Sequence, residues 1–237
     1  MLYALERLKV VWGISMNHYS WLWQCVLFFN EFTRAFLYYV LLPLVLTHRF
    51  HMPIEWVGFC TSCQFAADAS TKLLYGIVAS RVYSRWIIRG GTAISGLSVL
   101  GLFFIHNSYL VLLFSVLFGC GAASIWPAAL LYYSHIHSRV QGESMAKVFT
   151  PWLAGTGTGM FLPNILLYQR SNMYMVLCLS TVIVFSGTLL LHPNEYEITP
   201  SLQREIKLMC ILFRKTRTFL SPMVLQTMVI GTITPFF

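Results

Sequence analysis

Long apolar segments alternate with short polar segments along almost the whole chain. A helix of about 20 apolar residues is long enough to cross the hydrocarbon core of a bilayer. We delimit seven such segments, at residues 20–46, 54–80, 87–106, 109–134, 145–168, 173–191 and 219–237. The one long polar segment, residues 192–218, lies between the sixth and the seventh. This pattern predicts an all-α integral membrane protein.

The composition supports the same class. Of the 237 residues, 57% are hydrophobic and 10% are charged, whereas about 25% of the residues of a soluble domain are charged. The net charge of +8 does not indicate a nucleic-acid-binding protein, because the basic residues lie between the apolar segments and form no continuous patch.

The sequence contains no nucleophile–base pair and no set of metal ligands that would indicate catalysis. Cys60 and Cys63 have the spacing of a redox or metal-binding pair, but no second cluster of cysteine or histidine accompanies them. A cysteine inside an apolar segment behaves as a small hydrophobic residue. We therefore expect neither an enzyme nor a bound cofactor.

Lysine and arginine predict the orientation of the chain, because they are enriched in the cytoplasmic loops of membrane proteins. Twelve of the 16 lie in the N-terminal segment and in the connections that would share its side of the membrane: Arg7, Lys9, Arg81, Arg85, Arg89, Arg139, Lys147, Arg204, Lys207, Arg214, Lys215 and Arg217. The opposite connections contain Arg49 and Arg170. The N-terminus and the 192–218 connector are therefore expected in the cytoplasm.

Four charged residues lie deep inside the apolar segments, away from their ends. Glu31 and Arg34 are near the middle of the first, and Asp68 and Lys72 are in the second. An ionised side chain at that depth costs about 2.5–3.5 kcal/mol on insertion scales, so it needs a partner or a function. The i,i+3 and i,i+4 spacings place each acid within reach of a base on its own helix, although Lys72 could instead extend toward the cytoplasmic surface.

Two interpretations of these residues stay open at this stage. In the first, the ion pairs are structural and lock two helices together. In the second, a buried carboxylate takes up and releases a proton, while Arg34 controls its charge or holds an anionic part of a substrate. Intramembrane acids commonly mark transport routes, which favours the second interpretation.

Small residues and tryptophans mark the fourth and fifth segments. Residues 119–127 combine small side chains, which allow close helix packing, with Trp126 beside Pro127. The fifth segment has Trp152 followed by glycines at alternate positions from Gly155. The tryptophans are either packing residues or cavity-lining residues whose flat faces suit sugar rings.

The end of the second segment resembles a loop signature of the major facilitator superfamily, Gly-x3-Asp-Arg-x-Gly-x-Arg. Gly76 and Arg81 match it, and Arg85 is a displaced match for its last arginine. Ser80 replaces the Asp and Tyr83 replaces a Gly, which puts the usual charge contact of this loop in doubt.

The layout is also similar to that superfamily, whose members join two six-helix halves through a cytoplasmic loop. The resemblance implies a six-helix N-terminal bundle at residues 1–191, a cytoplasmic connector at 192–218, and the first helix of a second bundle at 219–237. On this view five helices of the second half are absent from the sequence, as in a fragment or a shortened gene product.

One branch of the superfamily resembles the chain more specifically, namely the lipoteichoic-acid glycolipid flippases. The similar stretches are residues 31–34, 67–71, 124–126, 152–155 and 220–226. This resemblance implies a proton-coupled antiporter that works by alternating access in the cytoplasmic membrane and is driven by a proton gradient.

The same resemblance implies roles for individual residues. Glu31, Arg34 and Asp68 would serve proton coupling and headgroup binding, and Trp126 and Trp152 would line the cavity against the sugar headgroup. The substrate would be a lipid or another amphiphile. Two rivals stay open: a proton-coupled exporter of small molecules such as drugs, and a non-transporting membrane fragment or assembly partner that needs a missing second half.

Overall fold

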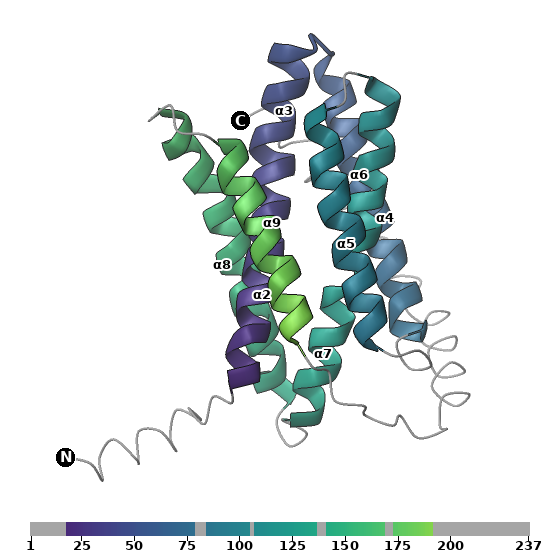
Figure 1. Ribbon diagram of the computed structural model, residues 1–237, viewed down its shortest axis with the longest axis vertical. Helices are drawn as coiled ribbons and strands as arrows, with labels where there is room; N and C mark the ends of the chain where they lie inside the picture. Colours follow the sequence, from purple (N-terminus) through teal and green to yellow (C-terminus); the bar gives the residue numbers. More distant parts are fainter. Residues whose placement is uncertain (1–17, 79–83, 105–106, 137–140, 169–172, 192–237) are drawn as a thin grey trace, which may run out of the picture.

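The computed structural model describes residues 18–78, 84–104, 107–136, 141–168 and 173–191 of the chain. Every regular element within these ranges is helical (Figure 1). The predicted connector at 192–218, the predicted helix at 219–237 and Arg81 of the loop signature lie outside the described residues.

Helices occur at each of the first six predicted positions. The first position holds a continuous rod, which we call span 1, made of α2 (His18–Ala35), η1 (Phe36–Leu41), α3 (Leu42–Leu44) and η2 (Val45–Arg49). The others hold α4 (Ile54–Val78), α5 (Ser84–Phe104), α6 (Ser108–Ala122), α7 (Ile125–Ile136), α8 (Gln141–Tyr168) and α9 (Met173–Leu190). Two stretches, Ser20–His48 and Ser108–Leu130, are long and apolar enough to cross a membrane by length and composition alone.

Two details differ from the predicted elements. The helix predicted at 109–134 is divided into α6 and α7 at Ala123 and Ser124. The Ser124 hydroxyl donates to the Gly121 carbonyl at 2.9 Å, and this carbonyl also accepts from the Ser124 backbone N–H at 3.2 Å. Pro127 falls in the first turn of α7, where a missing N–H costs nothing. Span 1 also contains the π-helical elements η1 and η2, which hydrophobic periodicity does not indicate.

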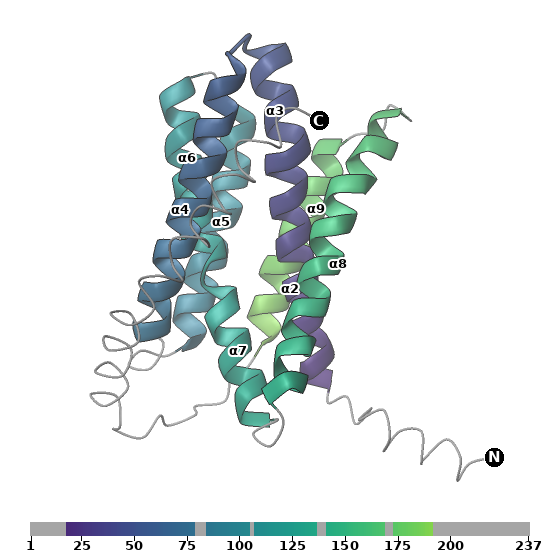
Figure 2. The ribbon, with the colours of Figure 1, turned by 180° about the vertical axis from the view of Figure 1, so that it is seen from behind.

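The helices form two groups that lie side by side (Figures 1 and 2). Span 1 packs with α8 and α9, and we call these the span-1 group. Helices α4, α5 and α6 pack together, and we call these the α4 group. Each group combines helices from the first and the second half of the described chain, and α7 contacts members of both.

Glycines bring helices into close contact within each group. A Cβ atom added at Gly119 of α6 would collide with the backbone carbonyl of Gln64 on α4, and one at Gly155 of α8 would collide with that of Phe28 in span 1. Such approach requires small residues at the interface. The predicted close packing is therefore confirmed at Gly119 and Gly155, whereas a Cβ at Gly157 would meet nothing within 4 Å.

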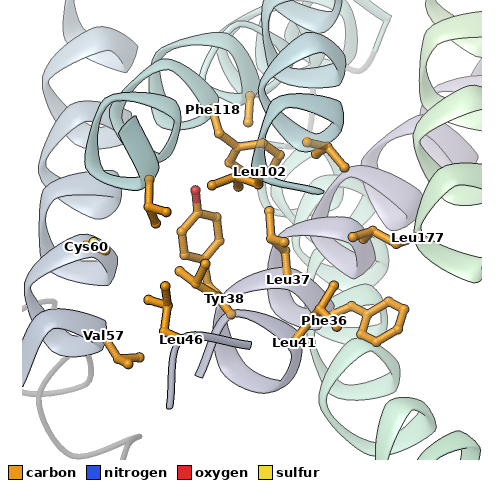
Figure 3. Packing of buried hydrophobic residues seen from close by; sticks show 14 of the residues in the cluster. Phe36, Leu37, Tyr38, Leu41, Leu46, Val57, Cys60, Leu102, Phe118 and Leu177 are labelled. Atoms are coloured by element: carbon orange, nitrogen blue, oxygen red, sulfur yellow. The ribbon is translucent and has the colours of Figure 1, made fainter. Parts of the chain in front are cut away.

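Aromatic and aliphatic side chains fill the space between the groups. Tyr38 of η1, which is 1% exposed, lies at the centre of the larger cluster (Figure 3). Its ring is 5.4 Å from the ring of Phe118 on α6. A second cluster surrounds Trp23 and Tyr133. The core thus holds span 1 against the α4 group both above and below the charged residues described next.

Candidate functional site

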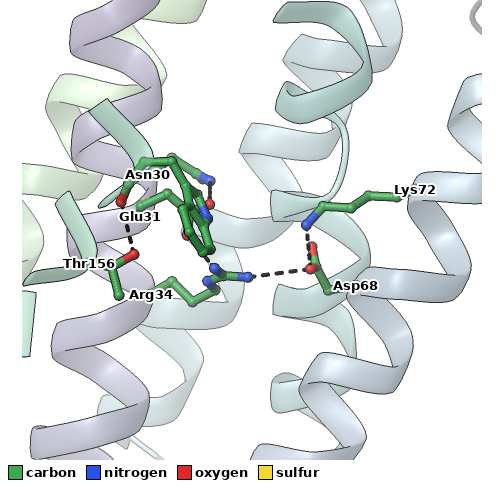
Figure 4. Close-up of polar contacts among 7 residues, drawn as sticks. Asn30, Glu31, Arg34, Asp68, Lys72 and Thr156 are labelled. Carbon is green, nitrogen blue, oxygen red and sulfur yellow. Dashed lines mark hydrogen bonds and ion pairs between the residues drawn. The ribbon is translucent and has the colours of Figure 1, made fainter. Parts of the chain in front are cut away.

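The four charged residues of the first two predicted segments form one continuous set of contacts, which we call the charged network (Figure 4). Arg34 pairs with Glu31 one turn earlier on α2. The other side of its guanidinium reaches across to Asp68 on α4, with Nη1 3.3 Å from Oδ2. Lys72 donates to the same Oδ2 at 2.6 Å. The predicted pairs on each helix are therefore present, and Lys72 contacts Asp68 rather than extending to the surface.

Arg34 joins the two helix groups, since Glu31 belongs to the span-1 group and Asp68 to the α4 group. Arg34 and Asp68 are 34 positions apart in the sequence. An arginine suits this position because its planar guanidinium has donors on two edges and can serve two carboxylates at once. A lysine would present a point charge instead.

The network is buried at one end and accessible at the other. Glu31, Arg34 and Asp68 are 1%, 7% and 5% exposed, whereas the Lys72 side chain is 27% exposed. Two carboxylates face two cations, so the network is neutral when both acids are ionised. A buried cluster of this kind is tolerated because each charge has an opposite charge in contact.

Neighbouring polar and aromatic groups complete the surroundings of the network. Asn30 donates to the Glu31 carboxylate at 3.3 Å. The ring of Phe65, which is one turn before Asp68 on α4, lies 5.3 Å from the Arg34 guanidinium. A cation over an aromatic face is attracted by the ring, and the attraction is stronger in a site with little water. Neither Asn30 nor Phe65 was a predicted site residue, because an amide or a phenylalanine inside an apolar segment has no distinguishing spacing.

An aromatic row begins at the accessible end of the network. Lys72 Nζ lies 5.6 Å from the ring centre of Trp126. The Trp126 ring meets Phe149 edge-on at 5.2 Å, and Phe149 meets Trp152 in the same manner at 5.9 Å. The predicted aromatic residues Trp126 and Trp152 therefore belong to one row, joined by Phe149, which the sequence did not single out.

The local sequence explains why this row exists. The break at Ala123 and Ser124 separates α6, which packs in the α4 group, from α7, which also contacts α8. Trp126 is the second residue of α7, and its ring lies between Lys72 of α4 and Phe149 of α8. Its indole Nε1 is buried without a hydrogen-bond partner among the described residues, and an indole N–H in such a position is available to an acceptor from a ligand or water.

The remaining predicted residues are only partly described. Gly76 lies in the last turns of α4, and Arg85 is the second residue of α5. Cys60 and Cys63 are free thiols on one helix, and within the described ranges no group of three or more metal-binding side chains occurs.

Residues 24–237 match the family model described as Major Facilitator Superfamily. The match covers most of the chain, so the chain belongs to the major facilitator superfamily. This family consists of multi-pass membrane transporters, and the paired internal charges and the helix packing described above fit that class.

More specific similarity is found to proteins named proton-coupled antiporter flippase LtaA. The protein of this name from Staphylococcus epidermidis is 24% identical over 163 residues, which cover 67% of this chain and 39% of the relative. The one from Staphylococcus aureus is 25% identical over 162 residues, which cover 65% of this chain and 39% of the relative. The aligned part of the chain thus spans about two fifths of the length of the relatives it matches.

Proposed function

We propose that the chain forms the N-terminal half of a proton-coupled antiporter that moves a glycolipid or another amphiphile across the cytoplasmic membrane by alternating access. The observation that carries this proposal is the charged network, in which two buried carboxylates share Arg34 across the two helix groups. The similarity to proteins named as proton-coupled antiporter flippases supports it.

The network offers a direct way to couple a proton to helix movement. When both carboxylates are ionised, Asp68 attracts Arg34 and Lys72 at the same oxygen. A proton on Asp68 removes the negative charge that both cations contact, and this weakens the connection between the groups. Loss of the proton restores it. Protonation therefore changes how firmly span 1 is held to α4, which is what a proton-driven conformational cycle requires.

The aromatic row supports a headgroup that contains sugar. Trp126, Phe149 and Trp152 present flat apolar faces next to Lys72 and to the unpartnered Trp126 indole N–H. This combination of stacking surfaces with a few polar donors is typical of sites that fix an amphipathic ligand. We propose that the row and the charged network contact the headgroup together.

Acyl chains of such a substrate would need apolar surface nearby. A groove of about 450 Å³ runs between α2, α8 and α9 and is lined mainly by phenylalanine and aliphatic side chains, among them Phe28, Phe32 and Phe161. Large apolar side chains are also exposed outside this groove, for example Leu97 on α5 and Val182 on α9. These surfaces are compatible with acyl chains that remain in the lipid while the headgroup crosses.

The experiment that tests the proposal uses the chain completed with a second six-helix half and reconstituted in liposomes that contain a fluorescent diglucosyl-diacylglycerol in one leaflet. An imposed pH gradient should accelerate movement of the label to the other leaflet, and collapse of the gradient should remove the acceleration. A rate of label movement equal to that in protein-free liposomes, both with and without the gradient, would contradict the proposal and favour a non-transporting membrane component. Gradient-driven extrusion of a cationic dye without glycolipid movement would favour the small-molecule exporter.

A further inference from the structure

A second polar group lies within the core, apart from the charged network. Gln64 on α4 and Ser115 on α6 are both 0% exposed. Neither the amide oxygen nor the amide nitrogen of Gln64 has a hydrogen-bond partner in the described part of the chain, and neither has the Ser115 hydroxyl. Native proteins rarely bury such groups unpaired, because an unmade hydrogen bond leaves the full cost of desolvation.

A tyrosine from a third helix completes this group. The Tyr38 hydroxyl donates to the Ser115 carbonyl at 3.4 Å, which is long for a bond from a hydroxyl. Figure 3 shows the Tyr38 ring between Cys60 of α4 and Phe118 of α6. Tyr38 therefore brings a hydroxyl group with remaining hydrogen-bonding capacity to the place where span 1, α4 and α6 meet.

The packing of α4 against α6 places Gln64 and Ser115 at a similar level. Gly119 contacts the backbone of α4 at Gln64 and Asp68, and Ser115 is one turn before Gly119 on α6. The two helices run in the same direction (Figure 1). Side chains of a helix lean toward its N-terminus, so the Gln64 side chain leans toward the turn of Ser115.

Asp68 lies one turn after Gln64 on the same helix, so the two side chains are neighbours at i,i+4 spacing. Among the described residues, the charged and titratable groups around Asp68 include Lys72 from α4 itself, Arg34 and, beyond it, Glu31 from span 1. They also include Tyr39 of η1, whose ring centre is 6.3 Å from that of Phe65, and Cys120 of α6, which accepts from Thr71 at 3.4 Å. Gln64 adds a neutral polar group on the side of Asp68 that faces Tyr38 and Ser115.

We propose that Gln64, Ser115 and Tyr38 bind ordered water one helical turn from Asp68, and that this water exchanges protons with the Asp68 carboxylate. A buried water makes two to four hydrogen bonds, and these three side chains supply that number of donors and acceptors. The role in proton exchange rests on the proposed function, whereas the water site itself does not.

The chemistry proposed for this site is a proton relay. A proton that binds to the ordered water is replaced by a different proton, which the water passes to the next hydrogen-bonded group. Each water and hydroxyl finishes with the number of protons it had at the start, and the Asp68 carboxylate gains one.

The first test concerns water and does not depend on transport. Gln64→Leu keeps most of the side-chain volume and removes the amide. If the amide were buried dry, its removal would raise the melting temperature of the protein in detergent, because an unpaired polar group would be lost. The water site predicts a lower melting temperature, since Ser115, Tyr38 and the water lose a partner. A higher melting temperature would overturn the proposal.

The matched control is Thr61→Val on the same helix. Thr61 is 3% exposed, but its hydroxyl already donates to the Val57 carbonyl at 2.9 Å. The Thr61→Val variant should therefore transport at a rate close to that of the parent when a proton gradient is imposed. Ser115→Ala and Ser115→Thr form a second pair, in which threonine keeps the hydroxyl. If Gln64→Leu does not fold, the melting temperatures of these two Ser115 variants test the water site instead.

The second test concerns the proton. Gln64→Leu and Ser115→Ala should slow gradient-driven transport about tenfold, the factor expected for loss of one hydrogen bond in the relay, while Ser115→Thr retains it. Exchange of labelled for unlabelled substrate without a gradient should remain. Equal slowing of both processes would overturn the proton role. If the parent protein showed no gradient-driven transport, the proposed function would fail, while the melting temperatures would still test the water site.

Discussion

Arg34 is the residue on which the charged network depends. It contacts both buried carboxylates, one in each helix group. Of the two carboxylates, Lys72 contacts only Asp68, and its side chain is partly exposed. Loss of a partner from a buried ion pair costs far more than loss of an exposed one, because the remaining charge stays buried without compensation. The two cations should therefore differ in their importance for stability.

We predict that Arg34→Ala lowers the free energy of unfolding by about 3–5 kcal/mol, whereas Lys72→Met lowers it by about 1 kcal/mol. Arg34→Ala leaves Glu31 with Asn30 as its neutral partner and leaves Asp68 with Lys72 alone. Denaturant unfolding in detergent, followed by tryptophan fluorescence, measures both variants. Equal losses would show that Arg34 is not the principal partner of the carboxylates.

At the scale of the helices, glycine positions decide how closely α8 approaches span 1. Gly155 faces the backbone of span 1, and Gly157 is two residues further along the same helix with open space around it. Alternation of this kind follows from the helical period, since residues two apart point in different directions. The same substitution should therefore have opposite effects at the two positions.

We expect Gly155→Ala to lower the free energy of unfolding by about 1–3 kcal/mol, because the added methyl group would meet the Phe28 carbonyl and force the helices apart. Gly157→Ala is the control, and it should raise stability by up to about 1 kcal/mol through the higher helix propensity of alanine. Thermal melting of the two variants side by side measures the difference. A stable Gly155→Ala variant would mean that α8 does not pack on span 1 as described.

At the scale of the whole molecule, the two groups are connected near the middle by the contact of Arg34 with Asp68. Toward one end, Tyr133 of α7 donates to the Ser20 carbonyl of α2 at 2.9 Å. Thr92 of α5 and Thr188 of α9 lie 3.2 Å apart through their hydroxyls. The charged network contains carboxylates that a proton can neutralise, whereas these hydroxyl contacts carry no charge.

The orientation in the membrane gives a prediction for the whole chain. We expect the N-terminus and the 192–218 connector to be cytoplasmic, because the basic residues favour that side. On a background without the native cysteines, Ser201→Cys should resist an impermeant thiol reagent in intact cells, and Glu55→Cys, at the exposed start of α4, should react. Labelling of Ser201→Cys in intact cells would contradict this prediction and indicate the opposite orientation.

Much of this arrangement could be predicted from the sequence, because periodicity and composition determine where apolar helices form. The ion pairs within α2 and within α4 also follow from spacing. The break before Trp126, the π-helical turns of span 1 and the place of Phe149 between the tryptophans could not be predicted, because they depend on how helices pack against one another. The role of Gln64 could not be predicted for the same reason, because the polar groups near it come from span 1 and α6 and depend on how three helices pack.

The central claim is that Asp68 carries the coupled proton, and Asp68→Asn tests it most directly. Asparagine keeps the shape and much of the hydrogen bonding of aspartate but cannot titrate. Arg34 would keep Glu31, and Lys72 would keep its place over Trp126, so stability should change little.

The measurement is gradient-driven movement of the fluorescent glycolipid in liposomes, with the melting temperature determined for the same preparation. We predict that Asp68→Asn abolishes the response to the pH gradient while the melting temperature stays near that of the parent. Undiminished gradient-driven transport in Asp68→Asn would contradict the claim, and joint loss of folding and transport would assign Asp68 a structural role instead.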